Sequence, residues 1–171
     1  MQYASSASVY GDSKNFNEDG ECRPMNAYAW SKYMFDRYVT TLDICDKITL
    51  QGFRYFNVYG SNEEHKGEQA SVFTKFRNQA ISESKIKLFE NSDKYKRDFV
   101  CVDDVVNVHR LMLSKSDSGI FNVGTGTATS FQRVADLCSN KLGVNVEYIE
   151  MPEWIDANYN AVEDIRKSTS T

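Results

Sequence analysis

The sequence predicts an α/β protein built around a parallel sheet. Short apolar segments of the kind that form buried strands alternate with segments whose apolar residues recur at helical spacing. Residues that can cap a helix, Asn26 and Ser130 among them, stand directly before helical segments. Such an alternation is typical of folds in which helices connect parallel strands.

The first elements follow from the residues before position 61. A strand ends at residues 2–4, and a polar loop rich in Ser, Gly, Asp and Asn leads to a helix over 27–45 that Asn26 can cap. A strand at 48–56 follows and is closed by 57–60. One face of the helix is expected to pack inward through its apolar residues, which are Met34, Phe35, Tyr38, Val39 and Leu42.

The remaining elements repeat the pattern. Strands are expected at 85–89, 98–102, 119–123 and 144–149. Helices are expected at 69–83, at 103–113 with Asp103 as its cap, and at 131–141 with Ser130 as its cap. The apolar side of the helix at 69–83 consists of Val72, Phe73, Phe76, Ala80 and Ile81. Phe73 and Phe76 are therefore expected in the core. The tail after residue 149 shows no clear periodicity.

Composition narrows the classes of protein. The 171 residues include 20 Lys and Arg against 24 Asp and Glu, so the net charge of −4 argues against nucleic acid or an anionic membrane as the main partner. No uncharged apolar run approaches the roughly 18 residues of a membrane span, and no signal peptide is visible. Four separated cysteines and two histidines predict no metal site and reduced thiols, which indicates a cytoplasmic protein.

Tyr28 and Lys32 could carry acid/base chemistry. They are one helical turn apart, so their side chains project from one face. A free phenol loses its proton near pH 10, and a nearby ammonium favours the phenolate. The alternative is an ordinary helix with an amphipathic tyrosine and a surface lysine.

Ser6 strengthens the chemical interpretation. It lies in the segment Ser5-Ser6-Ala7-Ser8-Val9-Tyr10-Gly11, just after a strand end, where ligands bind in parallel sheets. A hydroxyl there can polarise a substrate oxygen for hydride transfer; by itself the segment is a polar turn. Together, Ser6, Tyr28 and Lys32 resemble the Ser/Tyr/Lys constellation of the extended short-chain dehydrogenase/reductases.

Further segments make the resemblance narrower. In order, the chain contains Gly52-Phe53-Arg54-Tyr55-Phe56-Asn57-Val58-Tyr59-Gly60, Glu64-His65-Lys66-Gly67, Ala70-Ser71-Val72, Lys87-Leu88-Phe89-Glu90, Lys96-Arg97-Asp98-Phe99-Val100 and Gly119-Ile120-Phe121-Asn122-Val123-Gly124-Thr125-Gly126. Over almost its whole length, the chain resembles the ADP-L-glycero-D-manno-heptose 6-epimerase family. The resemblance implies a Rossmann-type doubly wound sheet and a smaller α/β substrate-binding domain.

The resemblance also implies a reaction. NADP, rather than NAD, takes a hydride from C6 of ADP-D-glycero-D-manno-heptose and returns it to the other face of a transient ketone, giving a precursor of the lipopolysaccharide inner core. Tyr28 and Lys66 are the implied acid/base groups, with Lys32 supporting Tyr28 and Ser6 contacting the substrate oxygen. Tyr28, Lys32, Val58 and Lys66 are the implied cofactor contacts. Without the resemblance, Lys66 is a solvated charge in a polar loop.

Substrate-binding residues follow by the same resemblance. They are Ser6, Asn57, Glu68, Lys75, Phe89, Glu90, Asn91, Ser92, Arg97 and Tyr159. A guanidinium such as that of Arg97 suits a diphosphate, although a surface arginine paired with Asp98 or Glu90 is the alternative. Glu68, Lys75 and Asn91 depart from the family pattern, which has a small hydroxyl residue, a histidine and a glycine there.

The expected organisation has two parts. Residues 1–60 form the C-terminal half of the cofactor domain with the catalytic Ser/Tyr/Lys, and residues 61–171 form mainly the substrate-binding region with returning Rossmann elements. No Gly-x-Gly-x-x-Gly loop precedes Ser5, and Gly124-Thr125-Gly126 lacks the third glycine, so we expect the C-terminal portion of an epimerase, homo-oligomeric when intact. One alternative is another nucleotide-sugar epimerase or dehydratase, such as a UDP-hexose 4-epimerase. The other is an inactive fragment that lacks the main cofactor-binding part of the domain.

Overall fold

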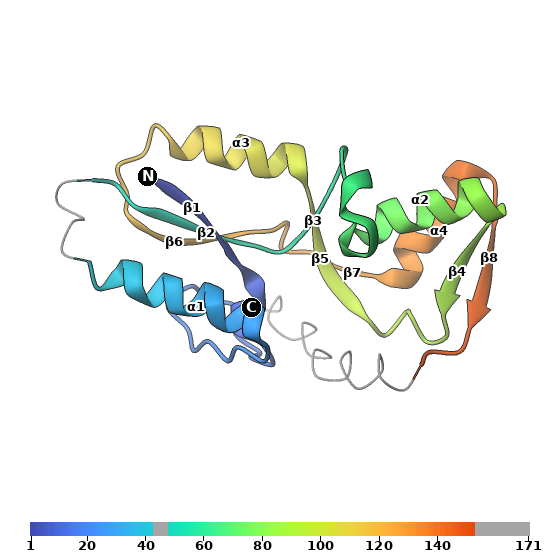
Figure 1. Cartoon of the computed structure of the whole chain (residues 1–171), viewed down its shortest axis with the longest axis horizontal. Coiled ribbons are helices and arrows are strands. Elements are labelled where there is room, and N and C mark those ends of the chain that lie inside the picture. Colours follow the sequence, from blue (N-terminus) through green and yellow to red (C-terminus); the bar gives the residue numbers. More distant parts are fainter. Residues whose placement is uncertain (43–47, 153–171) are drawn as a thin grey trace.

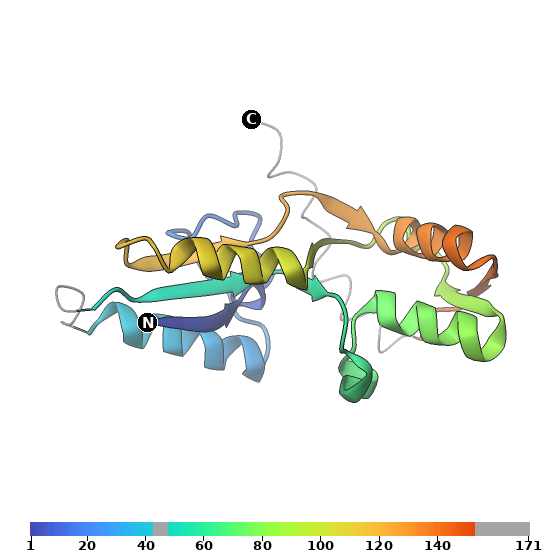
Figure 2. The ribbon, with the colours of Figure 1, turned by 90° about the horizontal axis from the view of Figure 1, so that it is seen from above.

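The computed structural model describes residues 1–42 and 48–152. Its first sheet is parallel, in the order β1-β2-β6, and helices α1 and α3 cover its opposite faces (Figure 1, Figure 2). The elements are β1 (Gln2–Ser6), α1 (Ala27–Thr40), β2 (Gln51–Tyr55), α3 (Val102–Met112) and β6 (Gly119–Val123). The prediction of an α/β fold with a parallel sheet is confirmed.

A second group of elements adjoins this sheet. Strands β3, β5 and β7 lead from it to a layer made by α2, α4, β4 and β8 (Figure 1). Strand β5 pairs parallel with β3 and antiparallel with β7, and β4 pairs parallel with β8. The bounds are β3 (Asn57–Tyr59), α2 (Val72–Glu83), β4 (Lys85–Phe89), β5 (Lys96–Cys101), β7 (Ala128–Ser130), α4 (Phe131–Leu142) and β8 (Asn145–Ile149).

Each group has its own apolar core. The first joins β2, β5, β6 and α3 through Phe53, Val100, Val105 and Val123. The second joins α2, β4 and α4 through Phe76, Ala80, Ile86, Leu88, Val134 and Ala135. Phe73 packs against this second core and stacks on Tyr59 with 4.1 Å between ring centroids, so the core prediction for Phe73 and Phe76 is confirmed.

The predicted cap residues locate the starts of α1 and α4. The Asn26 Oδ1 atom accepts a hydrogen bond from Ala29 N at 2.8 Å, and the Ser130 Oγ atom accepts one from Arg133 N at 3.1 Å. The cap prediction for Asp103 is wrong, because α3 begins at Val102 with Cys101 in the cap position. Asp103 lies instead in the first turn, where a negative charge is favourable near the helix N-terminus.

The prediction that the apolar face of α1 packs inward is wrong in part. The buried residues of α1 are Ala29, Asp36 and Val39, whereas Met34 and Tyr38 are each 59% exposed. This face of α1 is buried because it carries Asp36, which forms a buried ion pair with Arg54 of β2. If the face centred on Met34 were buried instead, Asp36 would not reach Arg54. The helix also ends at Thr40, and residues 43–45 of the expected helix lie outside the described residues.

Helix α2 begins later than expected. Residues Glu64–Gln69 form the short 3-10 helix η2, which contains a non-helical φ of 51° at Gly67, and Ser71 caps α2. Ile81 is 66% exposed rather than on the apolar side, because the buried stripe of α2 runs through Phe76 and Ala80 toward β4 and α4. Another short 3-10 helix, η1 (Ala7–Tyr10), follows β1 directly.

Three features of the described residues bear on class and chemistry. No helix within residues 1–42 and 48–152 is long and apolar enough to cross a membrane. Over the same ranges, no cluster of three or more His, Cys, Asp or Glu side chains could hold a metal ion. Cys22, Cys101 and Cys138, the cysteines in the described part of the chain, are free thiols.

Candidate active site

The start of α1 brings Tyr28 and Lys32 to the end of β1. The Lys32 Nζ atom donates a hydrogen bond to the carbonyl oxygen of Ala4 at 3.1 Å and lies 5.7 Å from the centroid of the Tyr28 ring. Tyr28 itself is 57% exposed, so a ligand can reach it. The expected adjacency of the two side chains is therefore present, with the ammonium fixed to the neighbouring strand.

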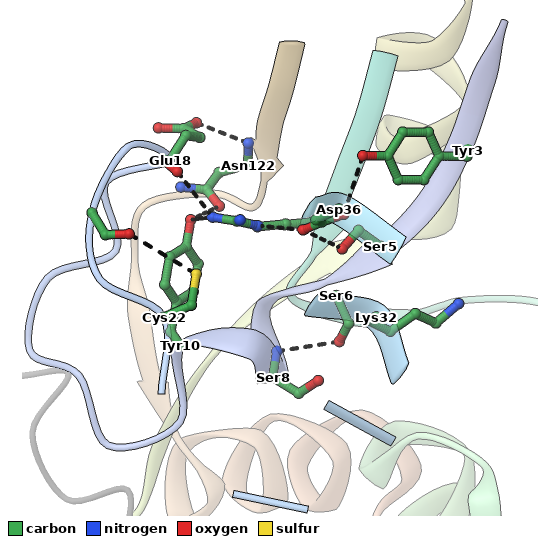
Figure 3. A network of polar contacts seen from close by, with 12 residues as sticks. Tyr3, Ser5, Ser6, Ser8, Tyr10, Glu18, Cys22, Lys32, Asp36 and Asn122 are labelled. Carbon is green, nitrogen blue, oxygen red and sulfur yellow. Dashed lines mark hydrogen bonds and ion pairs between the residues drawn. The ribbon is translucent and has the colours of Figure 1, made fainter. Parts of the chain in front are cut away.

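Ser6 is the last residue of β1, the strand to which Lys32 is hydrogen-bonded, and Figure 3 shows it together with Lys32. Its Oγ atom accepts a hydrogen bond from Ser8 N at 3.2 Å and so caps η1. Among the described residues, the buried hydroxyl oxygen of Ser8 has no hydrogen-bond partner. The end of β1 thus carries the Ser6 hydroxyl group on the same strand whose Ala4 carbonyl oxygen accepts a hydrogen bond from Lys32.

Asp36, one turn beyond Lys32, anchors α1 to the sheet. Its carboxylate is almost fully buried and accepts hydrogen bonds from Tyr3 Oη at 3.1 Å and Ser5 Oγ at 3.0 Å, both from β1 (Figure 3). It also forms an ion pair with Arg54 Nε of β2 at 3.0 Å. Burial and the neighbouring Asp36 carboxylate raise the pKa of the Tyr3 hydroxyl, which therefore remains a donor. The rotation of α1 is consequently fixed from two strands.

Arg54 extends this network to the loop before α1. Its Nη1 atom donates to Tyr10 Oη at 3.0 Å and to the carbonyl oxygen of Glu18 at 3.2 Å. The Tyr10 hydroxyl in turn donates to Asn122 Oδ1 of β6 at 2.8 Å, and the Glu18 carboxylate accepts from Asn122 N at 2.8 Å. All three strands of the first sheet and the loop are thus connected near the Ser6 end of β1 (Figure 3).

Sequence reasoning missed Asp36 and Arg54 as a pair. The available signals were an arginine inside an apolar strand segment and an aspartate four residues after Lys32 on a helix with apolar neighbours. A buried charge of either sign requires a partner. Both residues could therefore have been flagged individually, but nothing local in the sequence joins position 36 to position 54.

Lys66 lies in a separate pocket of about 310 Å³. Asn57 and Val58 of β3 also line this pocket, as do Phe99 of β5 and Phe131 of α4. The structure thus brings Lys66 together with the two β3 residues that the resemblance assigns to substrate and cofactor. The Lys66 side chain is 43% exposed, which leaves its ammonium accessible to a ligand.

Glu63 is a buried acid in the same pocket that sequence reasoning missed. Its Oε1 atom is 3.1 Å from Lys66 Nζ, and its Oε2 atom accepts hydrogen bonds from Thr74 Oγ1 at 2.7 Å and from Ser71 Oγ. Burial raises the pKa of Glu63, but the hydrogen bonds from Ser71, Thr74 and Lys66 outweigh burial and lower that pKa to about 2. The carboxylate therefore stays charged at neutral pH.

The lowered pKa of Glu63 predicts a pH dependence of stability. Because the folded-state pKa of about 2 lies below the ordinary value of 4.5, the stabilisation is present above pH 4.5 and is lost as the pH falls toward 2. Urea unfolding of Glu63→Gln and of the parent at pH 7 and pH 3 should give a smaller loss of unfolding free energy on acidification for the variant. The exposed Glu150→Gln serves as control, and an equal loss for parent and Glu63→Gln would contradict this prediction.

Other predicted substrate residues line a second, larger pocket. It has a volume of about 620 Å³ and shares Ala70, Val72 and Phe131 with the Lys66 pocket. The predicted residues that line it are Glu68, Lys75, Phe89 and Ser92. Lys75 Nζ is 3.4 Å from Glu68 Oε2, so the two departures from the family pattern form an ion pair with each other.

The remaining predicted residues lie beside this pocket or elsewhere. Asn91 has a φ of 60°, in the left-handed region where asparagine is the best-tolerated substitute for glycine, which explains how it can replace the family's glycine. Glu90 N donates to the carbonyl oxygen of Ile149 at 2.9 Å. Arg97 Nη1 donates to the carbonyl oxygen of Lys96 at 2.7 Å. Tyr159 lies outside the described residues.

Asp98 follows Arg97 on β5 and is bonded to the segment after β6. Its carboxylate accepts hydrogen bonds from Thr125 N at 2.9 Å, Thr125 Oγ1 at 2.6 Å and Gly126 N at 2.8 Å. It thereby holds the turn after β6, and a Cβ at Gly124 would lie 2.6 Å from Asp98 Oδ2. The Gly124–Gly126 segment is thus a turn that ends a strand, as the sequence predicts, rather than a phosphate-binding loop.

Comparison with known proteins agrees with this fold and site. A family model described as the NAD dependent epimerase/dehydratase family matches residues 1–124, which is more than half of the chain. The chain therefore belongs to this family.

Comparison with individual proteins points to a narrower group than the family model does. The chain is 45% identical over 163 residues to the ADP-L-glycero-D-manno-heptose-6-epimerase of Brachyspira hyodysenteriae, covering 92% of this chain and 51% of that protein. The crystal structure of the Helicobacter pylori enzyme of the same name has a TM-score of 0.79 and 32% identity, covering 95% of this chain and 54% of that one. The Thermotoga maritima UDP-glucose 4-epimerase with UDP-glucose has a TM-score of 0.74 and 25% identity, covering 89% and 50%. The chain spans about half the length of these relatives, and the resemblance to the 6-epimerases is confirmed.

Proposed function

We propose that the protein interconverts the C6 epimers of ADP-glycero-D-manno-heptose through a transient ketone, using NADP, and so supplies a precursor of the lipopolysaccharide inner core in the cytoplasm. The observation that carries this proposal is the presence of two separate acid/base candidates. Tyr28 stands at the end of β1 with Lys32 beside it, and Lys66 stands in a pocket with Asn57 and Val58. Epimerisation through a ketone needs a proton acceptor and a proton donor on the two faces of the reacting carbon.

The end of β1 suits a nicotinamide cofactor. The exposed Tyr28 hydroxyl, the Lys32 ammonium and the buried, unpartnered Ser8 hydroxyl oxygen are polar groups of the kind that hold a ribose and a carboxamide. When bound, the oxidised cofactor supplies hydride acceptance and return at the substrate carbon. The family description, NAD dependent, supports a nicotinamide cofactor. The preference for NADP over NAD belongs to the proposal.

The chain's own groups move the protons. On one face, the Tyr28 phenolate takes the proton of the C6 hydroxyl as the ketone forms, and Ser6 donates a hydrogen bond to the same oxygen. On the other face, the Lys66 ammonium gives a proton to that oxygen when the ketone is reduced. In the reverse direction the two groups exchange roles. Lys32, whose Nζ atom lies 5.7 Å from the centroid of the Tyr28 ring, supports Tyr28 in this role.

The two adjoining pockets suit the two ends of the substrate. The Lys66 pocket takes the heptose, and the larger pocket with Phe89, Ser92, Glu68 and Lys75 takes the nucleotide end. Their shared lining residues Ala70, Val72 and Phe131 support a single extended ligand that spans both. Arg97 binds the diphosphate in this arrangement. We also propose that the intact protein is a homo-oligomer.

A direct assay separates this function from a UDP-hexose 4-epimerase. The protein, prepared as the product of its complete reading frame, is incubated with NADP and either ADP-D-glycero-D-manno-heptose or UDP-glucose, and each mixture is followed by proton NMR. We expect the C6 epimer to accumulate from the heptose alone, because a second acid/base group at Lys66 serves the second face. Conversion of UDP-glucose to its C4 epimer, with the heptose unchanged, would contradict the proposal.

A further inference from the structure

Glu63 and Lys66 form a coupled pair inside the candidate site. Glu63 is 5% exposed, and its Oε1 atom lies 3.1 Å from Lys66 Nζ. The glutamate also accepts hydrogen bonds from Ser71 N at 3.3 Å, from Ser71 Oγ and from Thr74 Oγ1 at 2.7 Å. One carboxylate thus joins η2 to the first turn of α2.

The position of the Glu63 carboxylate does not depend on Lys66. Three of its hydrogen bonds come from Ser71 and Thr74, which belong to the start of α2, where the helix N-terminus also favours a negative charge. Lys66, by contrast, has a long flexible side chain that is 43% exposed. Because the acid is already fixed, pairing costs only the conformational freedom of the lysine.

Among the described residues that line the pocket, none besides Glu63 offers Lys66 an ionic partner. Glu63 and Lys66 are the ionisable residues among those lining it; the others are apolar or neutral. Gly67, directly after Lys66, has a φ of 51°, a conformation that favours glycine, and residues 69–72 beyond it line the same pocket. The fixed Glu63 carboxylate is thus the ionic partner of Lys66 among the described residues of this pocket.

We propose that Glu63 is a positioning residue that holds the Lys66 ammonium in place for proton delivery to the substrate oxygen. The inference rests on the proposed function, in which Lys66 is the acid/base group of one face. In the reductive direction, the Lys66 ammonium loses one proton to the oxygen of the ketone and becomes an amine. In the oxidative direction, the amine takes the hydroxyl proton and becomes an ammonium. Glu63 remains a carboxylate throughout.

Chemical labelling measures how strongly Glu63 restrains the Lys66 amine, and it does not require catalytic turnover. Limiting treatment with an N-hydroxysuccinimide acetate ester at neutral pH, followed by peptide mass spectrometry, gives the relative reactivity of Lys66. Glu63→Gln should raise that reactivity by about two- to fivefold, as expected for the loss of one ion pair to a partly exposed lysine. Thr74→Val, which loosens the carboxylate without removing it, should give a smaller increase. Glu64→Gln removes a neighbouring exposed carboxylate and should leave Lys66 labelling unchanged.

Kinetics of the complete reading frame's product give the second readout. Glu63→Gln should lower kcat for epimerisation by about 10- to 100-fold while KM changes little, because the reacting group is misplaced but substrate contacts remain. The inference is overturned if Glu63→Gln matches Glu64→Gln in both labelling and kcat while Lys66→Met is inactive. If Lys66→Met itself is fully active, it is the proposed function that fails.

Discussion

Replacing Tyr28 by phenylalanine is expected to lower kcat for epimerisation by about 10²- to 10⁴-fold, the usual contribution of a positioned acid or base. The substitution removes only the hydroxyl group of a residue that is 57% exposed and does not belong to the buried core. Folding should therefore be unaffected. The measurement is the initial rate of C6 epimer formation by NMR, together with the thermal midpoint of the variant.

Tyr38→Phe provides the matched control for Tyr28→Phe. Tyr38 lies on the same helix, is 59% exposed and plays no part in the proposed chemistry. It should retain the parent's rate. Slow oxidation and reduction on the face that Lys66 serves should persist in Tyr28→Phe. Parent-like epimerisation by Tyr28→Phe would remove Tyr28 from the mechanism.

Asp36→Ala is expected to lower the free energy of unfolding by about 3–5 kcal/mol. The change leaves the Arg54 guanidinium, which is 3% exposed, without its ion-pair partner, and it removes the acceptor of the Tyr3 and Ser5 hydroxyls. An uncompensated buried charge is among the costliest defects in a folded protein. Urea denaturation at pH 7, followed by circular dichroism, measures the loss.

Two comparisons separate the ion pair from a general effect of truncation. Asp93→Ala, at an exposed aspartate, should change the unfolding free energy by less than about 0.5 kcal/mol. The double variant Asp36→Ala, Arg54→Ala should lose less than the sum of the two single variants, because it leaves no buried charge. A stability of Asp36→Ala within about 1 kcal/mol of the parent would show that the network does not anchor α1.

Local features of the fold could be predicted from the sequence because their causes are local. The caps at Asn26 and Ser130 each depend on a side chain and a backbone N–H three residues later. The strands at 85–89 and 119–123 have the predicted bounds because their apolar residues are bounded by clear turns. The pairing of Tyr28 with Lys32 follows from helical geometry alone.

Features that depend on distant partners could not be predicted. Asp36 meets Arg54 across 18 residues, and this contact, rather than apolar spacing, decides which face of α1 is buried. Glu63 meets Ser71 and Thr74 only after Gly67 has turned the chain. The ion pair of Glu68 with Lys75 likewise requires the turn between η2 and α2. Each of these contacts modifies the candidate site, which explains why the motifs located the site but not its supporting groups.

The central claim, that two acid/base groups from different elements serve the two faces of the substrate, is tested most directly by Lys66→Met. Methionine keeps much of the side chain's length and apolar stem while removing the ammonium. The complete reading frame's product carrying this change is assayed for conversion of ADP-D-glycero-D-manno-heptose, with the exposed Lys115→Met as control. We predict that Lys66→Met loses most epimerisation and that Lys115→Met retains it. Full epimerase activity in Lys66→Met would contradict the two-group mechanism.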